Sequence, residues 1–184
     1  MMKKLIITLL IASSSLLAGT INVAVAANVS YAIDELKAEF KKSNPDTKVQ
    51  VTLGSSGKLT AQITNGAPYG VFMSANMKFP EALYEQKIAM AKPIVYAQGE
   101  LAYLSSKPMD FSKGMSLVKD KSIKKIAVAN PTTAPYGKAA IEAMKNGEVY
   151  DKVKSKFVYA ESVSQVVTYA VTAADIGFVA KSSL

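Results

Sequence analysis

The sequence predicts an α/β fold with mainly parallel sheets flanked by helices. Three observations indicate this class. Short apolar segments typical of strands alternate along the chain with segments of helical periodicity. Asn-Gly and Asn-Pro pairs, which end helices or form turns, separate several of these segments. Of the 184 residues, 49% are hydrophobic and 20% are charged, so the chain can bury a core.

Residues 1–19 have the pattern of a secretory signal peptide. Two lysines precede the apolar run 5–12, which is too short to span a bilayer, and mostly small residues follow it. We expect cleavage after Ala18 or Gly19. The remaining chain is therefore expected in a bacterial periplasm.

The first helix is predicted directly after a buried strand at residues 21–26. Its apolar face consists of four residues at helical spacing, namely Val29, Ile33, Leu36 and Phe40. Asn44-Pro45 ends this helix. Asn28 lies at the corner between strand and helix, at or next to the N-cap. An asparagine in this place either caps the helix only or also donates to a ligand.

Two serines and two glycines, Gly54-Ser55-Ser56-Gly57, lie where a strand at 48–53 passes into a helix. Such a corner, called the serine corner below, offers unpaired backbone N–H groups, hydroxyl donors and the positive end of a helix dipole. It is therefore a candidate anion site. A third strand is predicted at 71–74, and Asn76 is expected to cap the helix after it. This strand–helix order predicts a parallel sheet with the ligand beyond the carboxyl ends of its strands.

The crossing into a second lobe is predicted at Ala97-Gln98-Gly99. This tripeptide separates two segments, 94–96 and 100–104, that are expected to be extended. We therefore assign residues 20–97 to the first lobe and residues 98–184 to the second.

The second lobe repeats the strand–helix plan of the first. A loop-like stretch at 108–121, in which one helical turn is expected, is followed by strands predicted at 125–128, 157–159 and 176–179. Two helices alternate with these strands and begin at Tyr136-Gly137 and at Ser162-Val163, where Ser162 can act as the N-cap. These two helix starts are further candidate anion corners.

Missing residue types exclude several kinds of chemistry. The chain has no Cys, His, Trp or Arg. A thiolate nucleophile, an imidazole base and an ordinary zinc or copper site are therefore excluded. The acidic residues form no cluster that suggests a metal cation. The net charge of +8 comes from scattered lysines without interleaved aromatic residues, which favours a solvated surface over nucleic-acid binding.

Two enzyme or nucleotide motifs partly match the serine corner. A nucleotide P-loop would need its first glycine at Thr52 and a Ser or Thr at Leu59, so the match fails. Ser55 and Lys58 match the SxxK motif of penicillin-recognising hydrolases, and Ser74-Ala75-Asn76 mimics their S-x-N. However, no K-T-G follows and the order of elements differs. A secreted Ser/Lys hydrolase is kept as the alternative of a different class.

Binding of a small oxyanion by uncharged donors is the chemistry that remains. Hydrogen bonds to a charged partner contribute about 1.5–3 kcal/mol each. A partly buried helix N-terminus adds up to about 1–2 kcal/mol. An oxyanion that keeps a proton would turn its hydrogen toward a donor's hydrogen. Such a site therefore favours a fully deprotonated tetrahedral oxyanion over monohydrogen phosphate.

Nearly the whole chain after residue 19 resembles the periplasmic molybdate-binding proteins of ABC importers. The most specific match is the serine corner followed by Gly66-Ala67-Pro68 and by the strand end Val71–Ala75. Further matches are Ile21–Ala24 with Ala27-Asn28, Ile126–Pro131 with Ala134–Gly137, Glu161-Ser162-Val163, and Ile176–Val179. The resemblance implies a type II periplasmic binding protein-like fold whose two lobes close on molybdate or tungstate.

The resemblance also implies the binding residues and the partners. The side chains of Asn28 and Ser56 and the backbone N–H groups of Ser56, Tyr136 and Val163 are implied to hold the oxyanion, with no direct ligand to a metal cation. No cofactor and no catalysis are implied. The implied partner is the membrane permease of an ABC importer, and the receptor is expected to be a monomer. A receptor for sulfate or another tetrahedral oxyanion is the alternative of the same class.

This chain departs from the family pattern at two places. Many members have a tyrosine hydroxyl donor where this chain has Ala180. Tyr136 either replaces that hydroxyl or simply packs the hinge. Members also continue well beyond the strand matched by 176–179, whereas this chain ends at Leu184. We therefore expect a C-terminal truncation that leaves the first lobe without its return segment and impairs folding.

Overall fold

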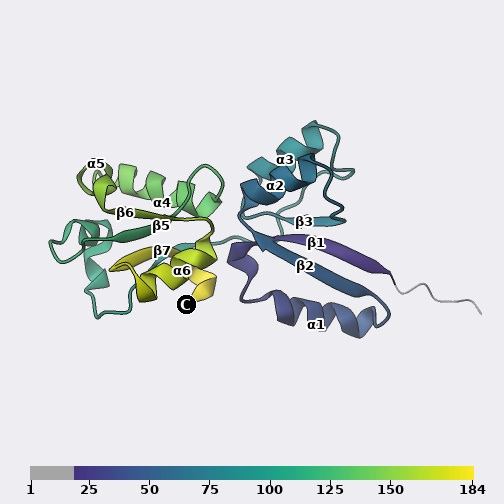
Figure 1. The fold of residues 1–184 in the computed structure, drawn as a ribbon, viewed down its shortest axis with the longest axis horizontal. Coiled ribbons are helices and arrows are strands. Elements are labelled where there is room, and N and C mark those ends of the chain that lie inside the picture. Colours follow the sequence, from purple (N-terminus) through teal and green to yellow (C-terminus); the bar gives the residue numbers. More distant parts are fainter. Residues whose placement is uncertain (1–18) are drawn as a thin grey trace, which may run out of the picture.

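The computed structural model describes residues 19–184, which form two lobes side by side, each built on its own sheet (Figure 1). The predicted signal peptide lies outside the described residues apart from Gly19. In both lobes, helices cover the two faces of a mainly parallel sheet, which confirms the predicted fold class. Among the described residues, no helix combines the length and apolarity needed to cross a membrane.

The first lobe contains a sheet of three parallel strands in the order β2-β1-β3. Its strands are β1 (Thr20–Ala26), β2 (Lys48–Gly54) and β3 (Val71–Met73). The central strand β1 is apolar without strict alternation and its second half is buried, as expected for a strand covered on both faces. In Figure 1, α1 (Ile33–Ser43) covers one face, and α2 (Ser56–Thr64) and α3 (Lys78–Glu85) cover the other.

The second lobe contains a sheet in the order β4-β7-β5-β6. Its strands are β4 (Leu101–Leu104), β5 (Ile126–Ala129), β6 (Phe157–Ala160) and β7 (Ile176–Ala180). β4 runs antiparallel to β7, whereas the other pairs are parallel. The longer helices are α4 (Pro135–Asn146) and α6 (Val163–Thr172), and the shorter ones are η2 (Phe111–Lys119), α5 (Tyr150–Val153), η3 (Lys154–Lys156) and η4 (Lys181–Ser183).

Strand β5 separates the two halves of the second lobe's core. All four of its residues are buried. Ile126 and Val128 belong to the cluster that α4 contributes to, whereas Ala127 and Ala129 belong to the cluster that α6 contributes to. Successive residues of a strand point to opposite faces, so this division follows from the sequence of β5. The cluster with Ala127 and Ala129 also contains Ala27 of the first lobe. The small side chains of these alanines allow the two lobes to pack closely at this cluster.

The predicted apolar face of the first helix is only partly buried. Val29 and Ile33 join the core of the first lobe with Val23 and Val25. Leu36 is 49% exposed and Phe40 is 39% exposed, so the predicted apolar face is buried only at its N-terminal end. The physical reason is the small width of the sheet, because three strands do not cover the whole apolar side of α1, which runs alongside β1 and β2 in Figure 1.

Several local predictions also differ from the structure. The N-cap of α3 is Met77 instead of Asn76, and it makes no side-chain capping bond. Residues 94–96 form no strand. The loop-like stretch at 108–121, where one helical turn is expected, holds the longer η2, which is interrupted at Gly114, where φ is 53°. The short helix α5 was missed, because four residues carry too little periodicity to predict a helix.

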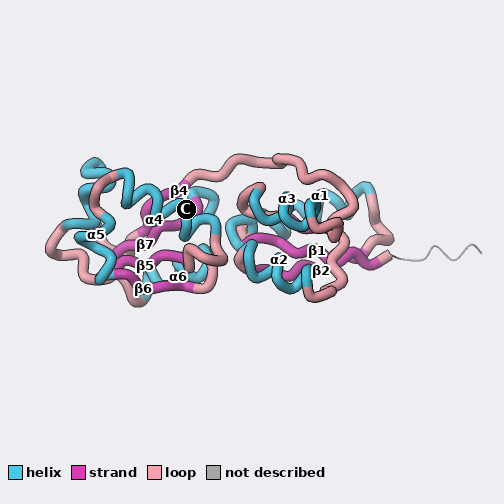
Figure 2. Tube along the Cα trace, turned by 90° about the horizontal axis from the view of Figure 1, so that it is seen from above, coloured by secondary structure: helices cyan, strands magenta, loops and turns pink. Residues whose placement is uncertain are grey.

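A long loop carries the chain from α3 in the first lobe to β4 in the second (Figure 2). The proposed lobe boundary between residues 97 and 98 falls inside this loop. Within residues 19–184, this is the one place where the chain passes from one sheet to the other. The relative position of the lobes therefore depends mainly on the contacts made where they meet.

Candidate anion-binding site

The serine corner joins β2 to α2 as predicted. Ser55 is the N-cap of α2, with extended backbone angles, and Ser56 is the first helical residue. Both are buried, and Ser56 is fully inaccessible to solvent. The Ser56 hydroxyl oxygen accepts a hydrogen bond of 3.0 Å from the N–H of Ala75 at the end of β3. Its own proton therefore stays available for donation to a ligand.

Ser55 holds a buried hydroxyl that makes no capping bond and has no hydrogen-bond partner among the described residues. An N-cap serine usually bonds a backbone N–H of the first helical turn. Buried polar atoms without a partner are uncommon in native proteins and call for an explanation. The corner therefore contains more hydrogen-bonding capacity than the fold itself uses.

Asn28 lies in the short helix η1 (Ala27–Val29) directly after β1, five residues before α1 begins at Ile33. The prediction that Asn28 is at or beside the N-cap of the first long helix is therefore wrong, because that N-cap is Ala32. Its Oδ1 atom is buried and has no partner in the described chain. Its side chain faces the hydroxyl of Tyr136 in the other lobe, where it acts to lower the pKa of that hydroxyl.

The third corner is the start of α4. Pro135 occupies the first turn, where its fixed φ and missing N–H suit the helix start, and Tyr136 follows it and is buried. The helix therefore begins two residues before the predicted Gly137. Gly137 is needed for close approach, because a Cβ at this position would lie 2.0 Å from the carbonyl oxygen of Ala129. This packing directs the first turn of α4 over the carboxyl end of β5.

The fourth corner is the start of α6 and agrees with the prediction. Ser162 is the N-cap, and its hydroxyl oxygen accepts a bond of 3.4 Å from the N–H of Gln165. Val163 is the first helical residue and is buried. The helix then packs its apolar side, including Val166 and Ala170, against the second sheet.

The structure brings the four corners together where the lobes meet. Ala27, next to Asn28, packs in one cluster with Tyr136 and Val163, and Ala75, which bonds the Ser56 hydroxyl, lies against the same cluster. The helix start at α2 reaches the loop before α4, because Gly57 donates its N–H to the carbonyl oxygen of Thr133 at 2.8 Å. All of these residues come from the carboxyl ends of strands, as expected for a ligand site in such sheets.

Three backbone donors at this junction have no hydrogen-bond partner in the part of the chain that the structure describes. In residues 19–184, no backbone hydrogen bond uses the N–H of Ser56, Tyr136 or Val163. Each lies in the first turn of a helix, where no intrahelical acceptor exists. The positive end of each helix dipole adds to the attraction for an anion. The three N–H groups come from both lobes and are those predicted as donors.

The Tyr136 hydroxyl remains a neutral donor over the physiological range. Burial raises the pKa of Tyr136, and the side chain of Asn28 offsets this in part. Burial also raises the pKa of Tyr96, and the neighbouring Tyr136 adds to that effect. The hydroxyl lies close to the backbone of Gly99, where an added Cβ would be 2.1 Å from it. Tyr136 thus contacts the loop between the lobes as well as Asn28.

The geometry does not assemble the Ser/Lys hydrolase considered from the sequence. Lys58 forms an ion pair with Glu161 of the second lobe. Ser55 is buried, and its hydroxyl has no hydrogen bond to a base. A serine nucleophile needs a base within hydrogen-bond reach. In the described part of the chain, no group of three acidic side chains could hold a metal ion.

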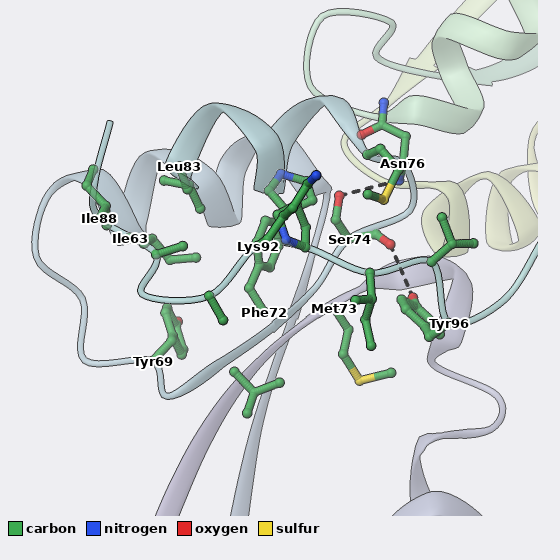
Figure 3. A pocket seen from close by; sticks show the side chains of 18 of the residues that line it. Ile63, Tyr69, Phe72, Met73, Ser74, Asn76, Leu83, Ile88, Lys92 and Tyr96 are labelled. Atoms are coloured by element: carbon green, nitrogen blue, oxygen red, sulfur yellow. Dashed lines mark hydrogen bonds between the residues drawn. The ribbon is translucent and has the colours of Figure 1, made fainter. Parts of the chain in front are cut away.

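A pocket of about 670 Å³ lies beside β3 and borders the junction at Ala75, and it is shown in Figure 3. Its lining is mostly apolar, with Phe72, Met73 and Leu83 among the side chains that point into it. At its polar end the carbonyl oxygen of Ser74 accepts a 3.2 Å bond from the Tyr96 hydroxyl. A lining of this kind does not suit a dehydrated dianion.

Sequence reasoning missed the contacts that join the lobes. Thr133 and Glu161 carry no motif, and their partners Gly57 and Lys58 lie more than 70 residues away in the sequence. The unpartnered hydroxyl of Ser55 was also missed as a possible donor, although its position beside Ser56 was a signal. Such pairings follow from the arrangement of the lobes, which local pattern does not specify.

Two α/β lobes with unused hydrogen-bond donors at their junction are the arrangement of a bilobal solute-binding protein. Comparisons with known proteins place the chain in the same class. A family model described as bacterial extracellular solute-binding protein matches residues 21–184. The molybdate-binding protein ModA of Rhodobacter capsulatus is 38% identical over 170 residues, covering 91% of this chain and 66% of that protein. ModA of Azotobacter vinelandii is 34% identical over 169 residues, covering 91% and 67%.

Solved structures give the same result. The periplasmic molybdate-binding protein of Azotobacter vinelandii superposes with a TM-score of 0.79 at 36% identity, covering 87% of this chain and 71% of that one. The sulfate-binding protein SubI of Mycobacterium tuberculosis H37Rv gives a TM-score of 0.69 at 11% identity, a likeness of fold alone. This chain belongs to the extracellular solute-binding proteins of bacteria, in the ModA family. It spans about two thirds of the length of these curated relatives.

Proposed function

We propose that this protein captures molybdate or tungstate outside the cytoplasm and delivers it, as a monomer, to the membrane permease of an ABC importer. The relatives named ModA are described as molybdate-binding proteins, which supports molybdate as the ligand. The proposal needs no catalysis and no cofactor.

One observation carries the proposal: uncharged donors from both lobes converge on one junction and remain unused by the fold. The N–H of Ser56 comes from the first lobe, and those of Tyr136 and Val163 come from the second. The hydroxyl proton of Ser56 adds to them, because its oxygen is already used as an acceptor. The Asn28 amide would contribute through the N–H groups of Nδ2, since its unpartnered Oδ1 is an acceptor. An anion held by all of these groups would link the lobes and favour their closed arrangement.

The energy available from such a site is sufficient without a cationic side chain. A hydrogen bond to a charged group contributes about 1.5–3 kcal/mol. Five such donors can offset the dehydration of a small dianion in a closed junction. Lys58, the lysine next to the serine corner, is already paired with Glu161. We therefore assign the site to neutral donors and not to lysine.

The hydroxyl that the family places at the position of Ala180 is replaced, in this proposal, by that of Tyr136. Ala180 is buried at the end of β7 and has no donor. The Tyr136 hydroxyl faces Asn28, one of the proposed ligand-binding side chains. It can therefore add a donor on the same side of the ligand.

Calorimetric titration of the chain without residues 1–19 tests the proposal. Molybdate and tungstate are expected to bind with one site per chain, and phosphate is expected not to bind at neutral pH, because its remaining proton faces a donor. Ligand at about 100 times the dissociation constant should raise the free energy of unfolding by about 2.7 kcal/mol. Preferential binding of sulfate would assign the receptor to another anion, and no binding of any of the four would refute the proposal.

A further inference from the structure

We propose that Gly57 and Thr133 form the contact that sets how closely the two lobes approach, so that Gly57 controls closure and Ser56 beside it controls binding. This inference rests on the proposed function in one respect: closure matters because the ligand lies between the lobes. It assigns a role to a residue that is not itself an anion donor.

The contact is a direct backbone bridge between the lobes. The N–H of Gly57, in the first turn of α2, donates to the carbonyl oxygen of Thr133, in the loop before α4, at 2.8 Å. First-turn N–H groups normally point at a ligand bound to the helix start. Here the N–H of Gly57 is taken by the other lobe, whereas the N–H of Ser56 is not.

Only glycine permits this approach. A Cβ at position 57 would lie 2.9 Å from the Cα and 3.0 Å from the carbonyl oxygen of Thr133, and 3.1 Å from the ring of Phe79. The ring can turn away, but the Thr133 atoms belong to the backbone of the other lobe. Any side chain at position 57 therefore pushes the lobes apart before the bridge can form.

Two other contacts flank the bridge and do not set the distance. Lys58 and Glu161 form an ion pair whose side chains are more than half exposed, and long side chains adjust to a changed separation. The Ser182 hydroxyl donates to the carbonyl oxygen of Asn28 at 3.0 Å. The apolar packing of Ala27 against Tyr136 and Val163 also joins the lobes, but Gly57 and Thr133 are the place where an added Cβ would meet the backbone of the other lobe.

The experiment compares Gly57→Ala with Gly70→Ala. Alanine suits a helix better than glycine, so α2 is not weakened by the first substitution. A Cβ at Gly70 meets its nearest atom at 3.8 Å, an ordinary contact, which makes it the matched control. Since the chain has no cysteine, Lys41→Cys and Lys152→Cys, both at exposed positions in different lobes, allow fluorescent labelling for energy transfer.

For Gly57→Ala we expect lower energy transfer than in the parent without ligand, a smaller increase on adding molybdate, and binding about 10-fold to 100-fold weaker. Gly70→Ala should match the parent, and circular dichroism and urea unfolding should show that both variants are folded. If Gly57→Ala shows the energy transfer of the parent and binds molybdate within about twofold of the parent, Gly57 does not set the distance between the lobes and the inference is wrong. If the parent binds no anion, the proposed function is refuted. The energy transfer of the parent and of Gly57→Ala without ligand would still test the contact between Gly57 and Thr133.

Discussion

Replacing Ser56 with alanine tests the proposed site most directly, because the hydroxyl of Ser56 has two separable roles. Its oxygen accepts the N–H of Ala75 at 3.0 Å, which ties the start of α2 to the end of β3. Its proton is proposed to bond the anion. Ser56→Ala removes both interactions and leaves the backbone N–H of residue 56 in place.

The two losses have different magnitudes and different assays. The N–H of Ala75 is part-buried and loses its acceptor, which should lower the free energy of unfolding by about 1 kcal/mol without ligand. Loss of a hydrogen bond to a charged ligand should cost about 1.5–3 kcal/mol of binding free energy. The dissociation constant for molybdate is therefore expected to rise about 10-fold to 150-fold.

Urea unfolding measures the first effect and isothermal calorimetry the second. Ser55→Ala is the matched control, since the Ser55 hydroxyl is buried and has no partner in the described chain. The usual cost of about 1 kcal/mol for losing an N-cap should not appear in that control, because Ser55 makes no capping bond. Unfolding of Ser55→Ala should thus match the parent.

The molybdate affinities of the two serine variants decide whether the Ser56 hydroxyl bonds the anion. If Ser56→Ala binds molybdate within about twofold of the parent, the hydroxyl does not bond the anion and the assignment fails. If Ser55→Ala weakens binding more than Ser56→Ala does, the donor is the neighbouring hydroxyl. A loss of stability without a loss of affinity would show that the bond to Ala75 is purely structural.

Two further predictions concern the second lobe. Hydrogen bonds from the Lys107 ammonium and from the N–H groups of Lys124 and Lys125 lower the pKa of Asp175 from 3.8 to about 2. The folded pKa is below the unfolded one, so this stabilisation is present above about pH 4 and is lost as the pH falls toward 2. Asp175→Asn should therefore lower the free energy of unfolding by roughly 1–2 kcal/mol at pH 7, after allowance for solvent screening, and by much less near pH 2; urea unfolding at both values checks this. Tyr136→Phe should weaken molybdate binding by about 10-fold to 150-fold, because it removes one hydrogen bond to the charged ligand and keeps the backbone N–H. If calorimetry gives a dissociation constant within twofold of the parent, the Tyr136 hydroxyl does not bond the anion and serves only in packing.

The sequence predicted the elements that local pattern determines. The strands of both sheets and the start of α6 at Val163 agree with the structure, because apolar runs and an N-cap serine are local signals. The third corner was placed within two residues of the observed start of α4. Since parallel strands end at the same edge of a sheet, the order of elements also indicated that the corners would lie near one another.

Tertiary packing decided what the sequence alone could not predict. Leu36 and Phe40 have the spacing of a buried face, but burial depends on how far the neighbouring sheet extends. Asn28 lies within the short helix η1 instead of at the start of a long helix, and no local signal distinguishes the two. The bridge from Gly57 to Thr133 depends on the relative placement of two lobes joined by a long loop, which no pattern within either lobe specifies.

The absence of histidine from the chain has a consequence for the conditions under which the receptor works. Amide N–H groups, an asparagine side chain and serine or tyrosine hydroxyls keep their protons from mildly acidic to mildly alkaline solution. In the proposed site, the strength of binding is then set by the charge state of the ligand and not by that of the protein. A receptor of this kind retains its affinity when the surroundings acidify, as long as the oxyanion itself stays unprotonated.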